Sequence, residues 1–210
     1  MRKLTALFVT LTLALAVQGF AGDKEKGFVR LDTGKNFDGW KINESKGSWS
    51  IEDGAFKAKG PRSHLFYVGD DKPFVNFELK VDVLTKDNSN GGIYFHTQYQ
   101  DSGWPKYGFE AQVNNSYKKD PRKTGSLYSV KDVLEAPAVD DKWFTEHISV
   151  KGKHVVIKVD GKTVVDYTEP ADAKAGKDFT RVVGKGTFAL QAHDPGSTVY
   201  FRNIRVKRLD

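Results

Sequence analysis

Residues 77–83 read FELKVDV, and this stretch decides the fold class. Phenylalanine, leucine and valine alternate in it with glutamate, lysine and aspartate. An alternation of this kind has the period of a β-strand that buries one face and leaves the other in water. The stretch therefore predicts a half-buried strand and excludes an amphipathic helix at this place.

Two Asp-Gly pairs predict hairpins on either side of that strand. Asp160-Gly161 separates VVIKV at 155–159 from TVVDY at 163–167, and Asp53-Gly54 separates two shorter β-rich runs. An Asp-Gly pair between two such runs is a strong hairpin signal, because both positions of the turn need positive φ.

Further short strands account for most of the remaining chain. We expect them at residues 28–31, 65–68, 92–98, 107–114, 126–130, 144–150, 187–193 and 198–206. All seven prolines fall between strand candidates, where a missing N–H group breaks no ladder. A dozen or so short strands, with no internal repeat and no linker, predict one all-β domain built as a two-sheet sandwich or a barrel.

The N-terminus has the layout of a secretory signal peptide. Two basic residues precede an apolar run at 4–17, and small residues flank position 20. The run is shorter than the roughly 20 residues that span a bilayer, so we expect no membrane anchor after cleavage. The predicted organisation is a signal peptide at 1–21 and one domain at 22–210, exported to the periplasm or secreted.

The composition excludes several classes of site. The chain has 33 Lys and Arg against 27 Asp and Glu, and it has no cysteine. Without cysteine there is no disulfide framework, no thiolate nucleophile and no Cys-based zinc or iron–sulfur site. The basic residues are scattered along the chain, and Lys118-Lys119, the densest pair, precedes an aspartate. The charge excess therefore does not predict nucleic-acid binding.

The strands differ in the residues that lie opposite their apolar face. In residues 77–83 that face carries charged side chains, as ordinary solvated faces do. In four other strands, at 93–98, 108–114, 188–193 and 199–202, it carries no lysine. The side chains there are amide, carboxyl, aromatic, imidazole and guanidinium groups: Tyr94, His96, Gln98, Glu110, Gln112, Gln191, His193 and Arg202.

This set of side chains suits a neutral ligand rich in hydroxyl groups, such as a sugar. It combines directional hydrogen-bonding groups with aromatic surface, and it brings little net charge. We therefore predict a ligand cleft on one face of one sheet. The alternative is that these residues are satisfied polar groups beneath a covering loop.

Glu110 is the candidate general acid or base of this cleft. His193 is the candidate neighbour that shifts its pKa, with Asp194 orienting the imidazole. A Glu110–Arg202 ion pair is the alternative. The phase of the apolar residues changes near 202–203, which predicts a β-bulge that turns Arg202 into the cleft. The histidines expected on the surface or in packing roles are His64, His147 and His154.

No metal or cofactor is predicted with certainty. His-x-x-x-His and Glu-x-x-His spacings are absent, so a transition-metal site is not favoured. Loop oxygens remain candidate ligands of a divalent cation such as Ca²⁺, around Asp38, Asp70-Asp71 and Asp87-Asn88. Walker loops, dinucleotide fingerprints and Gly-x-Ser-x-Gly are also absent.

Seven ordered motifs carry a family resemblance. They are GF at 27–28 with NFDGW at 36–40, WSIEDG at 49–54, NGGIYF at 90–95, GFEAQ at 108–112, TGSLY at 124–128, LQAH at 190–193 and FRNIR at 201–205. In these motifs the chain resembles the 3-keto-disaccharide hydrolase domain family, also called domain of unknown function 1080. Family members often carry Ser-Gly-Ile-Phe-Phe-Arg where this chain has GGIYFH at 91–96, so the contact expected at His96 departs from the family pattern.

The resemblance implies a fold and a reaction. The fold is a concanavalin A-like lectin/glucanase jelly-roll sandwich of two antiparallel sheets with little helix. The reaction is cleavage of 3-keto-glycosides by elimination and hydration, because a ketone at C3 acidifies the C2 hydrogen. On this interpretation Glu110 and His193 share the proton transfers, while Arg202 and Gln112 stabilise oxygen charge. The residues expected to hold the sugar are Tyr94, His96, Gln98, Trp104, Tyr128 and Gln191.

Two other functions remain open from the sequence. A lectin-like module without turnover would use the same fold and the same hydroxyl-friendly face. A two-carboxylate glycosidase is less favoured, because the same-face neighbours of Glu110 are Gly108 and Gln112 and not acids. The expected partner is a small carbohydrate and not a nucleic acid, whereas the linkage, any metal requirement and the oligomeric state stay open.

Overall fold

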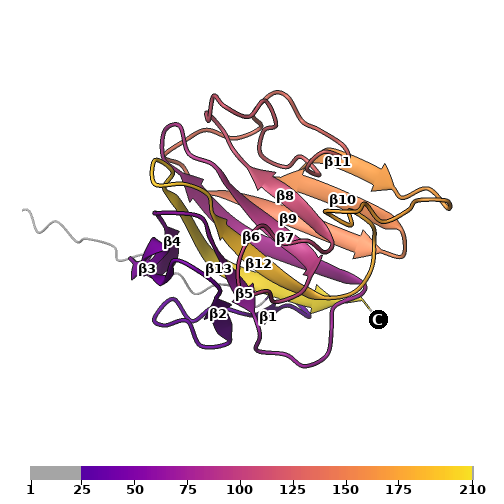
Figure 1. Cartoon of the computed structure of the whole chain (residues 1–210), viewed down its shortest axis with the longest axis horizontal. Coiled ribbons are helices and arrows are strands. Elements are labelled where there is room, and N and C mark those ends of the chain that lie inside the picture. Colours follow the sequence, from indigo (N-terminus) through magenta and orange to yellow (C-terminus); the bar gives the residue numbers. More distant parts are fainter. Residues whose placement is uncertain (1–24, 210) are drawn as a thin grey trace, which may run out of the picture.

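The computed structural model describes residues 25–209, and the predicted signal peptide at 1–21 lies outside them. Within this range the strands form two antiparallel sheets that pack face to face, one of eight strands and one of five (Figure 1). No helix of the described range is long and apolar enough to cross a membrane. The prediction of an all-β sandwich of two antiparallel sheets with little helix is confirmed.

The eight-stranded sheet has the order β11-β10-β9-β6-β13-β4-β3, and β1 also pairs with β13. Its strands are β1 (Val29–Arg30), β3 (Trp49–Glu52), β4 (Ala55–Ala58), β6 (Phe77–Thr85), β9 (Phe144–Lys151), β10 (His154–Val159), β11 (Lys162–Thr168) and β13 (Val199–Arg208). The five-stranded sheet has the order β2-β5-β12-β7-β8. Its strands are β2 (Trp40–Ile42), β5 (Ser63–Tyr67), β7 (Gly91–Thr97), β8 (Phe109–Val113) and β12 (Thr187–Ala192). A 3-10 helix, η1 (Lys46–Ser48), precedes β3.

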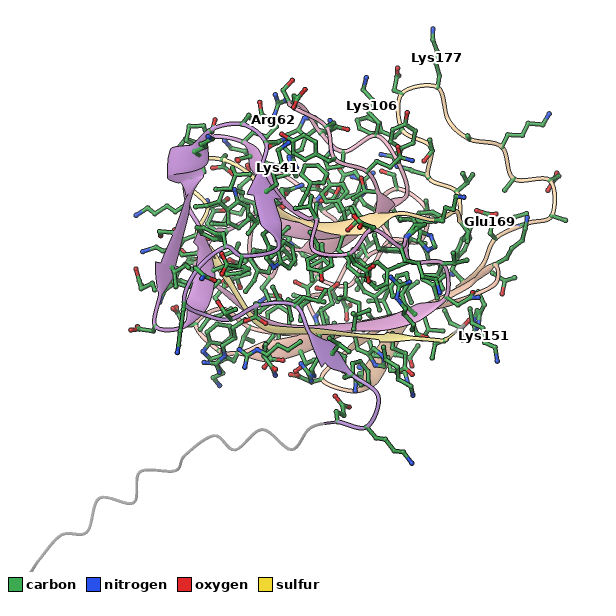
Figure 2. All side chains as sticks on the ribbon, turned by 90° about the horizontal axis from the view of Figure 1, so that it is seen from below. Lys41, Arg62, Lys106, Lys151, Glu169 and Lys177 are labelled. Carbon is green, nitrogen blue, oxygen red and sulfur yellow. The ribbon has the colours of Figure 1, made fainter. Side chains whose placement is uncertain are left out.

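Aromatic side chains join the two sheets through the core. In β6 every second residue is buried, as its alternation predicts. The ring of Phe77 lies 6.1 Å from that of Phe95 in β7 and 5.0 Å from that of Phe188 in β12, between ring centroids. Figure 2 shows the two layers from the side, with side chains filling the space between them. Since the core occupies this inner space, any ligand has to bind on an outer face or at an edge of the sandwich.

Both predicted Asp-Gly hairpins are present. Asp160 and Gly161, between β10 and β11, have φ of 47° and 79°. Asp53 and Gly54, between β3 and β4, have φ of 49° and 76°. Two consecutive positive φ angles are those of a type I′ turn, whose twist matches the twist of the flanking strands.

One predicted strand is wrong. Residues 126–130 form only isolated bridges, in which Leu127 pairs with Ala111 and Lys131. The hydroxyl of Ser126 donates to the carbonyl of Lys123 and accepts from the N–H of Val133, and such side-chain bonds compete with a ladder. The short strand β2 is not among the predicted ones, because three residues are too few to show an alternation.

Three connections surround the outer face of the five-stranded sheet. They are residues 98–108, between β7 and β8, residues 114–143, between β8 and β9, and residues 169–186, between β11 and β12. The N–H of Thr180 donates to the carbonyl of Lys106 at 2.8 Å and so joins the first connection to the third. The strands β7, β8 and β12 therefore carry an outer face that protein covers in part.

Candidate functional site

A cavity of about 290 Å³ lies on the outer face of the five-stranded sheet. The strands β7, β8 and β12, with the residue that follows β12, contribute Tyr94, Phe109, Glu110, Gln112, Gln191 and His193. The segment before β7 and the three connections contribute Asn90, Trp104, Pro105, Gly108, Asp120, Tyr128, Phe179 and Arg181. The structure thus brings together seven of the residues predicted for the site, on strands and loops that are distant in sequence.

Strand pairing explains why the central residues are neighbours. Tyr94 of β7 lies directly opposite Glu110 of β8, and on its other side it pairs with Ala189 of β12. Gly92 lies opposite Gln112, and a Cβ atom at this glycine would come within 2.3 Å of the Oε1 atom of Glu110. Only a residue without a side chain leaves space there for the carboxyl group.

Neutral donors hold the carboxyl group of Glu110. The hydroxyl of Tyr94 donates to Oε2 at 2.8 Å, and the amide of Gln191 donates to Oε1 at 3.0 Å. The same amide donates to the hydroxyl of Tyr94 at 2.9 Å, which closes a three-residue cluster. No Lys or Arg forms a salt bridge with this carboxyl group within residues 25–209.

Burial raises the pKa of Glu110 to about 7, against an ordinary value of 4.5. The bonds from Tyr94 and Gln191 oppose this rise, the charge of Asp120 adds to it, and the charge of Arg181 opposes it. A carboxyl group with such a pKa exchanges its proton near neutral pH, as a general acid or base must. Desolvation, and not the imidazole of His193, is therefore the main cause of the shift, contrary to the expectation from the sequence.

His193 lies at the wall of the cavity in a fixed orientation. Its Nδ1 atom is 2.8 Å from Oδ2 of Asp194, as predicted, and the hydroxyl of Ser197 donates to the same carboxylate oxygen at 2.7 Å. The imidazole packs against the rings of Trp104 and Tyr117, with centroids 5.4 and 5.6 Å away. The aspartate therefore sets the orientation of the imidazole, and the aromatic walls restrict its movement.

Arg202 does not belong to the cavity. The predicted bulge is present, because the pairing of β13 with β6 shifts between Arg202 and Arg205 and Asn203 has φ of 50°. However, β13 belongs to the eight-stranded sheet, and the guanidinium of Arg202 lies 3.7 Å above the ring of Trp143. Arg202 alternates with the buried Phe201 and so lies on the outer face of that sheet, and the bulge comes after it. Both its predicted place in the cleft and the alternative ion pair with Glu110 are therefore wrong.

His96 and Gln98 do not line the cavity either. His96 has φ of 55°, which breaks the alternation of β7 at this residue. Its ring is buried, with Nε2 2.9 Å from the carbonyl oxygen of Val75, and Nδ1 accepts from the N–H of Gly184 at 3.2 Å. Gln98 follows the end of β7 and is exposed. Extrapolating the alternation to the end of the strand placed both side chains wrongly.

The cavity also contains residues that sequence reasoning missed. Arg181, with φ of 44°, places its guanidinium 5.7 Å from the ring of Tyr128 and 5.2 Å from that of Phe179. Asp120 accepts a hydrogen bond from the hydroxyl of Tyr128 at 3.1 Å. Both lie in connections, where no periodicity marks the direction of a side chain.

His64 lies in the layer beneath the cavity. It pairs with Gln191 across β5 and β12, and its ring is 5.5 Å from that of Tyr94 and 5.6 Å from that of Trp104. Burial lowers its pKa to about 3, and the charge of Arg62 contributes. The ring is therefore neutral at physiological pH and has a packing role, as the sequence suggests.

Several buried polar atoms of the cavity have no hydrogen-bond partner among the described residues. They are both amide atoms of Gln112, Oε1 of Gln191 and Oδ1 of Asn90. Leaving such an atom unpaired costs about 1–3 kcal/mol. Hydroxyl groups of a bound sugar would satisfy these atoms, and the rings of Trp104 and Tyr128 add stacking surface.

No metal centre is evident in the described part of the chain. Within residues 25–209, no group of three or more His, Asp and Glu side chains has the arrangement needed to hold a metal ion. Of the candidate Ca²⁺ ligands, Asp70 pairs with Arg208 at 2.8 Å and Asp38 accepts from the amide of Asn36 at 2.6 Å.

Comparison with solved structures finds proteins of similar fold. A candidate glycosyl hydrolase from Parabacteroides distasonis superposes with a TM-score of 0.74, at 24% identity over 88% of this chain and 94% of that one. The carbohydrate binding module CBM66 from Bacillus subtilis superposes with a TM-score of 0.55, at 16% identity over 80% of this chain and 95% of the module. At these identities the likeness establishes the fold alone.

Sequence comparison identifies the family. A 3-keto-disaccharide hydrolase from Bacteroides thetaiotaomicron is 26% identical over 88% of this chain and 79% of its own length. The model of the 3-keto-alpha-glucoside-1,2-lyase-like domain matches residues 27–207, nearly all of the described range. The chain therefore belongs to the 3-keto-alpha-glucoside-1,2-lyase-like domain family, a family of carbohydrate-active, hydrolase-like proteins.

Proposed function

We propose that this protein cleaves 3-keto-glycosides, with Glu110 as the base that removes the C2 proton. The observation that carries the proposal is the carboxyl group of Glu110, whose pKa is about 7 and which only neutral donors hold. It lines a cavity of about 290 Å³ together with unpaired amide atoms and aromatic rings. Membership of the family supports the same reaction.

The elimination begins at C2 of the 3-keto sugar. The carboxylate of Glu110 takes the C2 proton, and the electron pair of that C–H bond moves into an enolate with its charge on the C3 oxygen. The enolate then re-forms the C3 carbonyl, a C1=C2 double bond forms, and the C1–O bond breaks. The leaving oxygen takes a proton, for which His193 is the proposed donor. Water adds to C1 and a proton to C2, so the sum is one water consumed per glycosidic bond.

Arg181 takes the electrostatic role that the sequence assigned to Arg202. Its guanidinium lines the cavity, whereas that of Arg202 lies on the other sheet. A fixed cation or hydrogen-bond donor beside a developing enolate oxygen typically accelerates a reaction by about 10²–10³. Gln112 and Asn90 bind sugar hydroxyls, and Trp104, Tyr128 and Gln191 complete the sugar site.

We further propose export to the periplasm or the medium, with a small carbohydrate and no nucleic acid as the partner. The basic, apolar and small-residue layout of residues 1–21 supports export. N-terminal sequencing of protein recovered outside the cytoplasm tests it, with Gly22 as the expected first residue. A product that retains residues 1–21 would contradict the proposal.

The activity test uses purified protein with 3-keto and unoxidised disaccharides. We expect products from the 3-keto substrates alone, and a loss of about 10²–10⁴ in kcat/KM for Glu110→Gln and for His193→Ala, each tested separately. Near-full activity in both folded variants would refute the assignment. Binding of unoxidised sugar without turnover of either substrate would make the protein a lectin-like module.

One observation favours a second reaction, ordinary glycoside hydrolysis. Two carboxyl groups, those of Glu110 and Asp120, line the cavity, and the charge of Asp120 contributes to the raised pKa of Glu110. A protonated acid and an ionised carboxylate are the pair that a glycosidase uses. Cleavage of unoxidised disaccharides that Asp120→Asn abolishes would establish this reaction in place of the elimination.

A further inference from the structure

A second hollow adjoins the cavity on the same side of the molecule. It has a volume of about 260 Å³, and Trp104 and Phe179 line both spaces. The other residues of the hollow are Arg62, Gly103, Lys106, Lys177 and Asp178. A ligand in the cavity that passes these two aromatic rings would therefore enter the hollow.

The two spaces differ in charge. The cavity contains the carboxyl groups of Glu110 and Asp120, the guanidinium of Arg181 and no lysine. The hollow contains three cationic side chains and one acid, Asp178. Among residues 25–209, neither Lys106 nor Lys177 forms an ion pair, so their charges are not neutralised by a neighbour. The hollow is thus the part of the binding region in which cationic side chains outnumber acidic ones.

Hydrogen bonds build the wall of the hollow. The guanidinium of Arg62 forms an ion pair with Glu44 at 2.8 Å and lies 5.2 Å from the ring of Trp104. The same carboxylate accepts from the N–H of Gly103 at 3.1 Å. Figure 2 shows Arg62, Lys106 and Lys177 on one side of the sandwich, with the two lysines extending outward. The hollow therefore has a wall of aromatic and guanidinium groups held by hydrogen bonds and an exposed cationic rim, which consists of Lys106 and Lys177.

We propose that this hollow is the subsite of the leaving sugar and that it selects a sugar with an anionic group, either a carboxylate, a sulfate or a phosphate. Lys106 and Lys177 bind that group at the mouth, since both are exposed there and lack counter-charges. The inner cavity takes the neutral 3-keto sugar, because its two carboxyl groups, those of Glu110 and Asp120, outnumber its one guanidinium, that of Arg181. The order of the two sugars rests on the proposed function, whereas the preference for an anion does not.

Binding measurements test the preference without any turnover. The full protein is titrated with methyl glucuronide, glucose 6-sulfate, glucose 6-phosphate and, as the neutral reference, methyl glucoside. At low salt we expect at least one anionic sugar to bind about tenfold more tightly than the reference, and the preference to shrink with added salt. The tightest of the three identifies the anionic group. Equal binding of all four would overturn the proposal.

A matched pair of double variants locates the effect. Lys106→Gln with Lys177→Gln removes the rim, and Lys151→Gln with Lys162→Gln removes two exposed lysines of the eight-stranded sheet with the same change in net charge. We expect the first to abolish the preference and the second to retain it. Equal loss in both would show a general effect of net charge and would overturn the proposal.

Kinetics separate this inference from the proposed function. If 3-keto-glycosides are cleaved, the rim variant should raise KM about tenfold for a substrate with a uronate leaving group. It should change kcat/KM for a glucose leaving group by less than about twofold. If no 3-keto-glycoside is cleaved, the proposed function fails, while the binding preference still decides whether the hollow takes an anion.

Discussion

The two sheets treat charge on their outer faces in opposite ways. On the eight-stranded sheet, side chains of opposite charge form ion pairs on a solvated face: Lys207 pairs with Glu78 at 3.6 Å, and Arg205 pairs with Asp82 at 3.4 Å. On the five-stranded sheet, Glu110 receives hydrogen bonds from a phenol and an amide. Both faces follow from the same alternation along strands, yet only the second lies beneath covering loops.

This difference separates a solvated surface from a reactive one. An exposed ion pair contributes about 0–1 kcal/mol, because water already stabilises both charges. A carboxyl group removed from water and given neutral partners costs folding free energy when it ionises, and the same cost makes it a stronger base. On the outer face of the five-stranded sheet, burial of the Glu110 carboxyl group therefore lowers the stability of the fold when the group ionises, and it also makes the group a suitable base.

Glu110→Gln tests this opposition between stability and catalytic activity, and it has the largest expected effect. We expect kcat/KM to fall by about 10³ or more, while the variant becomes more stable than the wild type at pH 8. The folded pKa of about 7 exceeds the ordinary 4.5, so this carboxyl group supports the fold fully below pH 4.5 and loses its contribution as the pH rises through 7. Thermal unfolding at pH 4 and pH 8, alongside the activity assay, measures both effects.

The matched control for that substitution is Asp82→Asn on the other sheet. Asp82 accepts from the hydroxyl of Thr145 at 2.9 Å and lies far from the cavity lining, so activity should stay within about twofold. If Glu110→Gln is no more stable than the wild type at pH 8, then the carboxyl group of Glu110 is not desolvated and the contrast between the two sheets is wrong.

Tyr94→Phe should move the pH dependence of catalysis. The wild-type kcat/KM should rise with pH through about 7 as Glu110 ionises, and this rise is the acidic limb of the pH profile. The hydroxyl of Tyr94 lowers the pKa of Glu110 by donating to the carboxylate, so its removal should shift this limb to higher pH. Tyr200→Phe, on the other sheet, is the control that should leave the limb in place. An unchanged or lower limb in Tyr94→Phe would contradict the assigned hydrogen bond.

Sequence reasoning succeeded where local chemistry decides the structure. The alternation in residues 77–83 and the Asp-Gly pairs depend on neighbours within a few residues, and the observed strand and turns agree with them. The same reasoning recovered Tyr94, Glu110 and Gln191 as members of one face, because a strand fixes the direction of every second side chain.

It failed where long-range pairing decides the structure. Alternation places Arg202 opposite Phe201 but does not say to which sheet their strand belongs. His96 has a positive φ, which ends the alternation in β7. Because this residue is not a glycine, the sequence gives no sign of that backbone conformation. Arg181 reaches the cavity from a connection that is far from β7 and β8 in the sequence, so only the assembled fold reveals it.

Glu146 is a second buried carboxyl group, and it does not line the cavity. It lies on the core side of β9, has no exposed surface, and neither carboxylate oxygen has a hydrogen-bond partner among residues 25–209. Burial raises its pKa well above the usual range, and repulsion from Glu110 adds to the rise. Its contribution to stability is therefore greatest below pH 4.5 and is lost as the pH rises.

Glu146→Leu should accordingly raise the free energy of unfolding at pH 8 by about 1–3 kcal/mol, with a smaller gain at pH 4. Chemical denaturation at the two pH values measures it, and Glu146→Gln serves as the control that removes the titration but keeps a polar group. Activity should stay within about twofold, because Glu146 is absent from the cavity lining. A loss of stability at both pH values would mean that the carboxyl group has a structural role.

The smallest effect is expected for Lys207→Met on the outer face of the eight-stranded sheet. Its partner Glu78 also lies 3.0 Å from Nε2 of His147, so the carboxylate keeps a polar neighbour after the substitution. We expect the free energy of unfolding to change by less than about 1 kcal/mol at low salt and by less again at 0.5 M salt, with activity unchanged. Urea denaturation at both salt concentrations measures the change. A change that exceeds that of Glu146→Leu would mean that the charges on this sheet are not merely solvated, and that the two faces differ less than their environments indicate.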